Sequence, residues 1–600
     1  SLANSILIKT QYHDFNIPLS ILDFFPGDDN WVLTFNTIIK LTFVNLLTKY
    51  INCNKYDQRY IIQIYTGRDY YTMKNNDTNH VITRRDFIKL SGAAAAFLSV
   101  PNLPGCSSAR IQNVPSIDYS RDLVIKNCTI IDVTSGRKRD RSAIHIRKGI
   151  IQSIYDGDSI PADAVVIDAA GTYAIPGLID AHCHPTITSA FSVDTIDLSR
   201  HMAFQKRQFT IAAEYGITTY RDMGSFNLTL HGIIDDINNG KMIGPRVIYC
   251  NSLLNMQGGH PDIPPTDAHP LAEFVALFTG MVMTNFKDLD ELKKILPKTA
   301  RGASFIKLTM DNRSVFCKKE PIPVYSDEML DYIFNYAREK GLPVSCHVHR
   351  KFGFDRALKY PINSLEHIVS DAYLDDRDIE LMAKKNVSIV PTMTIGLAYM
   401  MEEAFDEIPV QFRNDFMMNE LNIRREYMAG EAYKHSDPVI HKKNLEALKD
   451  YKAIGRDNLW KKKKFLVDPE LYFGMVLYGT KSLMKMRSAG ITIGLGIDAG
   501  MPLSYFGGLY REMEYLSRAG FKNDEILKIA TINGARILGL QDRIGTLEKG
   551  KIADIVLLPT NPLTNVLAYR APDLVIKEGR IIFSRNVLPV AMISGNTNQL

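Results

Sequence analysis

Residues 174–184 read AIPGLIDAHCH, an apolar run that ends in two histidines separated by a single cysteine. The apolar character predicts a buried strand, and alternate side chains of a strand point to the same face. His182 and His184 can therefore aim their imidazoles at one cation. Because an H-x-H pair also arises by accident, the prediction of a metal site depends on what the rest of the chain supplies.

Apolar segments of strand character recur through the middle of the chain and alternate with amphipathic stretches. Stretches such as 206–215 and 326–340 have the spacing of crossover helices. Repeated strand–helix units favour a parallel sheet, and eight of them favour a closed (β/α)8 barrel of the TIM type over an open doubly wound sheet. The candidate strands lie at 179–184, 218–222, 246–251, 305–310, 343–349, 364–368, 388–393 and 491–498.

Short strands also precede and follow this middle region, with Gly and Asp between them. We therefore predict an α/β protein in which residues 107–175 and 545–600 together form a small antiparallel β-sandwich beside a barrel at 176–544. The candidate strands of this composite domain lie at 122–132, 142–147, 149–155, 164–168, 553–558, 574–577 and 580–583.

The connection between the seventh and eighth strands is unusually long. Residues 395–488 include two stretches of helical pattern, at 411–427 and 441–451. Loops of such length usually have a function. We expect a helical insertion that covers the barrel mouth or shapes the substrate site, and a surface decoration is the alternative.

The chain before residue 107 has the features of an extension followed by an export signal. Residues 1–72 are interpreted as an upstream extension outside the fold, and Met73 as a candidate start. Residues 83–89, TRRDFIK, resemble a twin-arginine (Tat) signal, and an apolar run leads from there to a candidate lipidation box at Cys106. We expect export through the Tat machinery to the periplasm or outer cell surface, with a lipid anchor at Cys106. The alternative for this stretch is a buried amphipathic helix.

Composition narrows the function classes. The 600 residues are 46% hydrophobic and 23% charged, which is ordinary for globular proteins and excludes a disordered or fibrous chain. A mean hydropathy of −0.10 excludes a polytopic membrane protein. The net charge of +5 is too small to indicate nucleic acid, and the lysine run at 461–464 fits a solvated helix face. Seven cysteines without tight spacing do not predict a disulfide scaffold.

Further polar side chains fall at the predicted carboxyl ends of the strands, where the loops of a barrel converge on the active site. A lysine inside an apolar strand is costly unless it is neutralised or reaches solvent. The histidines could instead be satisfied core residues, and the aspartate could be a helix N-cap. These residues are Lys307, His347, His349, His367 and Asp498, with His260 in the loop after the third strand.

Several ordered motifs resemble one family. The strand PGLIDAHxH at 176–184 is similar to the first-strand signature of the amidohydrolase superfamily, in the branch of the imidazolonepropionase-like enzymes and metal-dependent prolidases, which are Xaa-Pro dipeptidases. The likeness covers nearly all of 121–585. The other matching motifs are GITTYRD at 216–222, GPRV at 244–247, GGH at 258–260, SLEH at 364–367, ATINGA at 530–535 and GTLEKGKIAD at 545–554.

The resemblance implies a metal-dependent amidohydrolase that cleaves a non-ester C–N bond of an amide, dipeptide or cyclic amide through a metal-bridged hydroxide. It implies two divalent ions, with zinc suiting histidine and oxygen ligands. Lys307, carboxylated by CO2, would bridge the ions, and Asp498 would also serve as general acid and base. His260 and His349 are candidates for substrate contact. The implied metal ligands are His182, His184, Lys307, His347, His367 and Asp498.

Two other functions remain open at this point. A mononuclear deaminase or ring hydrolase would use His182, His184, Asp498 and one histidine of the fifth strand, but it would have no need of Lys307. A non-catalytic binding protein on the same barrel would typically have lost metal ligands. The sequence does not separate His347 from His349 as the ligand, and it does not identify the substrate. A homo-oligomer is also compatible with the sequence.

Overall fold

The computed structural model describes residues 118–157, 160–189, 198–261, 282–315, 321–399, 410–454 and 469–585, together with five short strands elsewhere. The chain divides into two compact units, 1–103 and 104–600. In the first unit, β1 (Ser5–Lys9) pairs with β2 (Asp14–Pro18) and β3 (Ile62–Thr66) pairs with β4 (Asp69–Met73), both antiparallel. The predicted twin-arginine signal and Cys106 lie outside the described residues.

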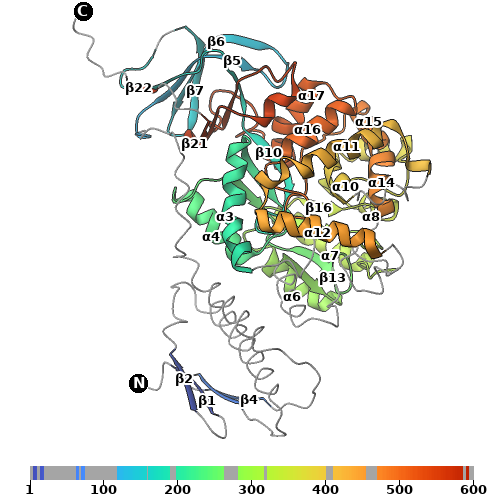
Figure 1. The fold of residues 1–600 in the computed structure, drawn as a ribbon. Helices are drawn as coiled ribbons and strands as arrows, with labels where there is room; N and C mark the ends of the chain where they lie inside the picture. The colour runs from blue at the N-terminus through green and yellow to red at the C-terminus, as the bar shows by residue number, and fades with distance from the viewer. Residues whose placement is uncertain are drawn as a thin grey trace, which may run out of the picture. The chain divides into compact units, whose positions relative to one another are not determined.

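Parallel strands form the centre of the second unit, and helices follow them along the chain and lie around them (Figure 1). One sheet has the order β10-β11-β12, and a second has the order β14-β13-β15-β16-β17-β18. The prediction of a mixed α/β fold with parallel strands is confirmed. The strands are β10 (Leu178–Cys183), β11 (Ile217–Asp222), β12 (Arg246–Tyr249), β13 (Leu253–Met256), β14 (Met283–Phe286), β15 (Ile306–Thr309), β16 (Val344–His347), β17 (Ser364–Glu366) and β18 (Ser388–Val390).

Hydrogen bonds join the two sheets into a ring. Residues 491–499 lie between β18 and β10, because Ile389 N donates to Thr492 O (3.0 Å) and Asp498 N donates to His182 O (2.9 Å). The predicted eighth strand is therefore present in position, although it makes only isolated bridges. Glycines explain this close packing, since a Cβ atom at Gly496 would lie 2.7 Å from Cβ of His182. On the other side, Ser304 N donates to Tyr249 O, which joins β12 to the segment before β15.

The crossover helices form where the sequence pattern predicts them. In α7 (Asp327–Lys340) the Ser326 side chain caps the first turn by accepting from Met329 N, and Gly341 ends the helix with φ of 64°. Its apolar face is buried against the barrel. The other helices that follow barrel strands include α3 (Leu198–Glu214), α4 (Asn227–Asn238), α6 (Leu289–Thr299), α8 (Lys351–Ala357), α9 (Asp376–Lys384), α15 (Thr480–Ser488) and α16 (Leu509–Arg518).

The two ends of unit 104–600 build one β domain with its own core. Strand β19 pairs with β9, and apolar side chains from both ends of the chain pack together apart from the barrel core. The composite organisation is thus confirmed, but the prediction of an antiparallel unit is wrong in part. Strand β5 runs parallel to β8 and β9, because the chain returns to β5 by a crossover instead of a hairpin. The strands are β5 (Leu123–Ile131), β6 (Lys138–Arg147), β7 (Ile150–Asp156), β8 (Val165–Asp168), β9 (Tyr173–Pro176), β19 (Ile555–Leu558), β20 (Leu574–Lys577), β21 (Arg580–Ser584) and β22 (Val590–Met592).

The predicted insertion is helical. It contains α10 (Met393–Tyr399), α11 (Asp415–Ala429), α12 (Pro438–Ile454) and α14 (Pro469–Gly474), and a π-helical turn joins α14 to α15. Helix α14 packs closely on the loop after β17, since a Cβ atom at Gly474 would lie 1.7 Å from the Ser370 carbonyl oxygen. The lysine run at 461–464 lies outside the described residues.

Two further findings concern the described residues only. None of their helices is long and apolar enough to cross a membrane. The cysteines among them, Cys128, Cys183, Cys250 and Cys346, are buried free thiols, in agreement with the absence of a predicted disulfide scaffold.

Candidate metal centre

Three predicted ligands meet where β10 ends beside the ring-closing segment. Oδ1 of Asp498 lies 3.3 Å from Nε2 of His182 and 3.1 Å from Nε2 of His184. His182 and Asp498 are buried. Asp498 also has φ of 56°, in the left-handed region that favours glycine, and such strained residues cluster at functional sites. The sequence prediction that these three side chains face one another is met by the fold.

The second ring nitrogen of each histidine fixes which atom faces Asp498. Nδ1 of His182 lies 2.8 Å from a Glu366 carboxylate oxygen, and Nδ1 of His184 lies 2.5 Å from the Gly224 carbonyl oxygen. Both oxygens can only accept, so each Nδ1 carries the proton. In the neutral imidazoles, the two Nε2 lone pairs then face a carboxylate oxygen. Three electron-rich atoms in such proximity fit a cation.

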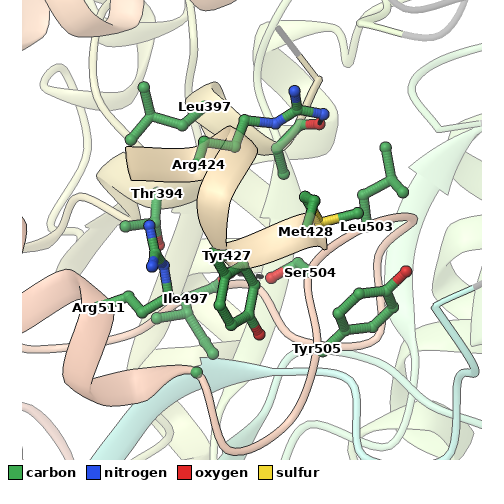
Figure 2. A pocket seen from close by; sticks show the side chains of 12 residues that line it. Thr394, Leu397, Arg424, Tyr427, Met428, Ile497, Leu503, Ser504, Tyr505 and Arg511 are labelled. Atoms are coloured by element: carbon green, nitrogen blue, oxygen red, sulfur yellow. Dashed lines mark hydrogen bonds between the residues drawn. The ribbon is translucent and has the colours of Figure 1, made fainter. Parts of the chain in front are cut away.

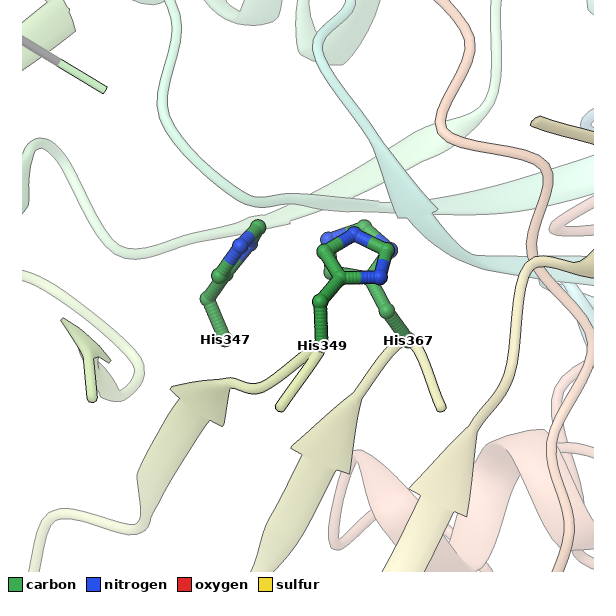
Figure 3. A group of neighbouring side chains, drawn as sticks. All are labelled: His347, His349 and His367. Atoms are coloured by element: carbon green, nitrogen blue, oxygen red, sulfur yellow. The ribbon is translucent and has the colours of Figure 1, made fainter. Parts of the chain in front are cut away.

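A second group of three histidines lies at the ends of β16 and β17 (Figure 3). The ring centroids of His347 and His349 are 4.9 Å apart, and those of His349 and His367 are 4.4 Å apart. Nδ1 of His367 lies 2.7 Å from the Thr392 hydroxyl, whereas Nε2 of His347 is buried without a hydrogen-bond partner. His367 has φ of 68°, so its backbone, like that of Asp498, lies in the left-handed region that favours glycine.

The second group is electrically neutral at physiological pH. Burial and mutual repulsion hold the pKa values of His347 and His367 well below the usual range. The same causes lower the pKa of His349 to about 3. Unprotonated imidazoles present lone pairs, which is the form that binds metals. The fold brings His349 as close as His347, so the geometry of the cluster alone does not choose between them.

Lys307 lies inside the barrel, on β15, within electrostatic range of both groups. Its ammonium is buried and Nζ has no hydrogen-bond partner. Burial lowers the pKa of Lys307 to about 8, and Arg221 adds to this lowering while Glu366 and Asp498 oppose it. With such a pKa the side chain is still mostly an ammonium at pH 7, but it is neutral far more often than an exposed lysine, and a neutral amine is a nucleophile.

His260, predicted as a substrate contact, also reaches this site. Its ring centroid lies 4.3 Å from that of His347, and its Nδ1 lies 2.9 Å from the Ser314 hydroxyl. Burial lowers the pKa of His260 to about 3, so it is a neutral imidazole. All of the predicted site residues are therefore found at one end of the barrel.

Sequence analysis missed several residues that support the ligands. Glu366 contacts His182, and Asp311 accepts hydrogen bonds from the backbone N–H groups of His349 (2.7 Å) and Arg350 (3.2 Å). Tyr472 of α14 lies with its ring centroid 6.1 Å from that of His349. For Glu366 a signal existed, because a carboxylate in an apolar strand needs a buried partner. Nothing in the spacing pointed to Tyr472.

A cavity of about 40 Å³ lies where the insertion meets the segment that carries Asp498 (Figure 2). Arg424 and Tyr427 of α11 line it on one side, and Arg511 of α16 lines it on another. Ile497, the neighbour of Asp498 in sequence, also lines it. The Arg511 guanidinium stacks over the Tyr427 ring at 4.3 Å. The insertion is thus built into the barrel beside the site and is not a detached decoration.

Comparison with known proteins agrees with the resemblance seen in the sequence. The model of the amidohydrolase family matches residues 173–582. The ochratoxinase of Aspergillus niger is 25% identical over 422 residues, which cover 67% of this chain and 73% of that protein. A 5-methylthioadenosine/S-adenosylhomocysteine deaminase of Desulforudis audaxviator is 36% identical over 134 residues, which cover 19% of this chain and 31% of that protein.

Solved structures share the fold at lower identity. A Xaa-Pro dipeptidase with bound methionine superimposes with a TM-score of 0.57 at 22% identity, covering 77% of this chain and 99% of that chain. The A. niger ochratoxinase structure gives a TM-score of 0.56 at 22% identity, covering 78% and 96%. The match to the family model spans more than half of the chain. The structure also brings histidines and a carboxylate together in groups that could hold metal ions. The chain therefore belongs to the amidohydrolase family, and it is a metal-dependent hydrolase that acts on carbon–nitrogen bonds.

Proposed function

We propose that this chain is a binuclear amidohydrolase that holds two zinc ions. His182, His184 and Asp498 would hold the first ion, and His347 and His367 the second. The observation that carries the proposal is the meeting of electron-rich atoms in two groups, buried except for the partly exposed His184, each with its ligand atoms within 4.8 Å of one another. Buried groups of this kind are unfavourable unless a cation lies between them.

We further propose that Lys307 becomes carboxylated and bridges the two ions. The ammonium first loses one proton, and the neutral amine then attacks CO2. A C–N bond forms and a second proton is released, so that a cationic side chain becomes an anionic oxygen ligand. The pKa of about 8 and the unpartnered Nζ support this step. The change of charge also suits a residue placed between two cations.

Of the two histidines on the fifth strand, we propose His347 as the ligand. Its Nε2 is buried without a hydrogen-bond partner, so its lone pair would be available to a metal ion. His349 instead has Nδ1 3.5 Å from the Ser370 hydroxyl and lies beside Tyr472 of the insertion. His349 and His260 would therefore contact the substrate.

The reaction follows from the side chains around this centre. Bound divalent ions supply an acidified water and polarise the scissile carbonyl. Asp498 accepts the proton of the attacking water at its carboxylate and returns it to the departing nitrogen. Neutral His260 and His349 can donate or accept hydrogen bonds to the polar atoms of the substrate. The buried setting strengthens each of these interactions because it excludes solvent.

The substrate class is proposed from the relatives. An ochratoxinase and a Xaa-Pro dipeptidase share the fold, and we propose a small amide of the N-acyl amino acid or dipeptide type. Insertion helix α14 places Tyr472 beside His349, so the insertion would form one wall of the substrate site. The mononuclear alternative is not adopted, because it gives no role to the buried Lys307.

We also propose that residues 73–106 direct export by the Tat machinery, with a lipid anchor at Cys106. The support is the sequence TRRDFIK and the apolar run after it. Cell fractionation of the chain with Arg84 and Arg85 both replaced by Lys tests this. Retention of the variant in the cytoplasm is expected, and export at the normal level would contradict it.

Metal content tests the proposed function. The full chain, purified with bicarbonate and analysed by inductively coupled plasma mass spectrometry, should contain close to two divalent ions. Lys307→Ala should lose metal, while the control Lys340→Ala, at the exposed end of α7, should not. The loaded protein should hydrolyse members of an amide and dipeptide panel. One ion that is insensitive to Lys307→Ala, or no ion in folded protein, would contradict the proposal.

A further inference from the structure

A buried charged network lies behind the first group of ligands, and the proposed reaction does not use it. Glu366 is 0% exposed and Arg221 is 1% exposed. Glu366 directs one carboxylate oxygen, Oε2, to Nδ1 of His182 at 2.8 Å. The other oxygen, Oε1, accepts from Arg221 Nη1 at 2.9 Å, and also from the hydroxyls of Ser345 (2.8 Å) and Ser364 (2.7 Å).

Arg221 is itself held on several sides. Its Nη2 donates to the hydroxyls of Ser345 (2.5 Å) and Ser364 (3.1 Å), the same hydroxyls that contact Glu366. Its guanidinium lies over the Phe305 ring, 4.4 Å from the centroid. Four strands of the barrel, β10, β11, β16 and β17, thus contribute to one closed set of hydrogen bonds. The carboxylate can neither rotate nor shift without breaking several of them.

Stability alone does not explain such a pair. Burying two charges costs several kcal/mol of desolvation free energy per ion, and the attraction between the charges offsets this cost only approximately. Well-packed apolar side chains can therefore often replace such a pair without loss of stability. A fully buried pair that also contacts a metal ligand therefore indicates a task beyond folding. Carboxylates that accept from a ligating histidine fix its tautomer and make it a stronger donor.

Two of the other proposed ligands lack a carboxylate at the second ring nitrogen. Nδ1 of His184 faces the backbone carbonyl of Gly224, and Nδ1 of His367 faces the neutral hydroxyl of Thr392. Among the proposed ligands that the structure describes, only His182 has its second nitrogen within hydrogen-bond distance of a carboxylate; the carboxylate contact of His347, between its Nε2 and Oδ2 of Asp311, is 3.9 Å long. The groups that hold the ligating histidines thus differ: a carboxylate contacts His182 at the first metal position, whereas a neutral hydroxyl contacts His367 at the second.

We propose that Glu366 and Arg221 are positioning residues for the first metal position. Glu366 holds His182 with Nε2 directed at Asp498, and Arg221, with Ser345 and Ser364, holds Glu366. This inference rests on the proposed function, because it assumes that His182 is a ligand. According to this inference, the affinity of the first metal position depends on Glu366 and Arg221, although neither residue would touch the ion.

Glu366→Gln is the direct test, because it preserves shape and removes the charge. Its amide can accept from His182 only if the NH2 group faces Arg221, so one contact must be lost. In metal-free full chain titrated with Zn²⁺ against a competing chelator, one equivalent should bind about 10–100-fold more weakly. That equivalent is identified as the one abolished by His184→Asn. The second equivalent should keep its affinity.

Two control variants separate positioning from general damage. Thr392→Val removes the contact to His367 and should weaken the other equivalent. Glu514→Gln breaks the ion pair between the buried Glu514 and the partly exposed Arg570, away from the ligands, and should lower thermal stability without changing either affinity. If Glu366→Gln lowers Zn²⁺ affinity no more than Glu514→Gln does, the inference is overturned.

Two further variants test the role of Arg221 and keep the inference testable if the Glu366→Gln protein does not fold. Adding Arg221→Met to Glu366→Gln should change Zn²⁺ affinity little, since Arg221 acts through Glu366. Replacing Ser345 and Ser364 by Ala together keeps both charges, and it should weaken the same equivalent by a smaller factor. Equal affinities in that protein and the wild type would overturn the inference. A wild-type chain that binds no Zn²⁺ would instead overturn the proposed function itself.

Discussion

Oδ1 of Asp498 lies 3.1 Å from Nε2 of His184, although the two residues come from opposite ends of the barrel sequence. The ring closure brings them together, because Asp498 N donates to His182 O and His184 N donates to Ala499 O. The position of the carboxylate is therefore fixed by backbone hydrogen bonds that a side-chain substitution leaves intact. Asp498 can therefore be replaced without altering the fold, and a replacement tests its proposed roles in metal binding and proton transfer together.

Asp498→Asn should abolish most turnover. The amide keeps the size of the side chain but cannot accept a proton from water, and loss of a general acid–base group costs about 10²–10⁴-fold in rate. The measurement is kcat on an amide that the wild type cleaves, together with a thermal melt. Asp376→Asn, on the surface of α9, is the control and should hydrolyse normally. Undiminished kcat in Asp498→Asn would remove Asp498 from the mechanism.

Uptake of CO2 by the metal-free protein should depend on pH with a midpoint near 8. Burial lowers the pKa of Lys307 to about 8, so the reactive neutral amine is scarce at pH 7 and dominant at pH 9. With bicarbonate as the carbon source, the neutral amine forms the carbamate and water with no net release of a proton, so the product follows the titration of the amine. ¹³C NMR after addition of ¹³C-bicarbonate should show a carbamate signal that grows over this range and is missing in Lys307→Ala. A midpoint near 10.5, typical of exposed lysine, would argue against the buried environment.

His347→Asn and His349→Asn should differ in metal content. Nε2 of His347 is buried without a hydrogen-bond partner, which suits a ligand, whereas the ring centroid of His349 lies 6.1 Å from that of Tyr472 in the insertion. We expect the first variant to lose one equivalent of zinc. The second should keep both equivalents and show a raised KM. The opposite pattern would exchange the proposed roles of the two histidines.

Gly474→Ala should displace α14 from the site. The added Cβ atom would lie 1.7 Å from a backbone oxygen of Ser370, which cannot move aside cheaply. We expect a loss of about 1–3 kcal/mol in unfolding free energy and a raised KM. Gly232→Ala, inside α4 where nothing lies within 4 Å of the new atom, is the matched control. It should gain about 0.5–1 kcal/mol from helix propensity. Normal stability and KM in Gly474→Ala would show that α14 is not held at Ser370.

Local patterns were sufficient to predict most strands and the ligand types. The barrel strands are apolar segments bounded by turn residues, and the proposed metal ligands stand at or just after their carboxyl ends, as at β10 and β16. Strand β14 was missed because it is four residues long and only partly buried. The parallel pairing of β5 with β8 was also missed, since the spacing of strands does not reveal whether the chain returns by a hairpin or a crossover.

Contacts across the barrel could not be predicted from one sequence. The pairing of Arg221 with Glu366 joins β11 to β17, and no local period relates these positions. The sequence could not choose between His347 and His349 for another reason. Alternation in a strand predicts that both face the same side, which the structure bears out, but the environment of each ring depends on Tyr472 and Ser370 from other elements.

The pairing of Tyr173 with Leu558 in the composite β domain has a consequence for synthesis of the chain. The strand that contains Tyr173 is made long before its partner leaves the ribosome, so its edge stays open throughout elongation. Exposed edges of apolar strands invite pairing with other chains. Long-range pairings of this kind also form slowly. The nascent chain must therefore keep this edge protected until its last strands have been made.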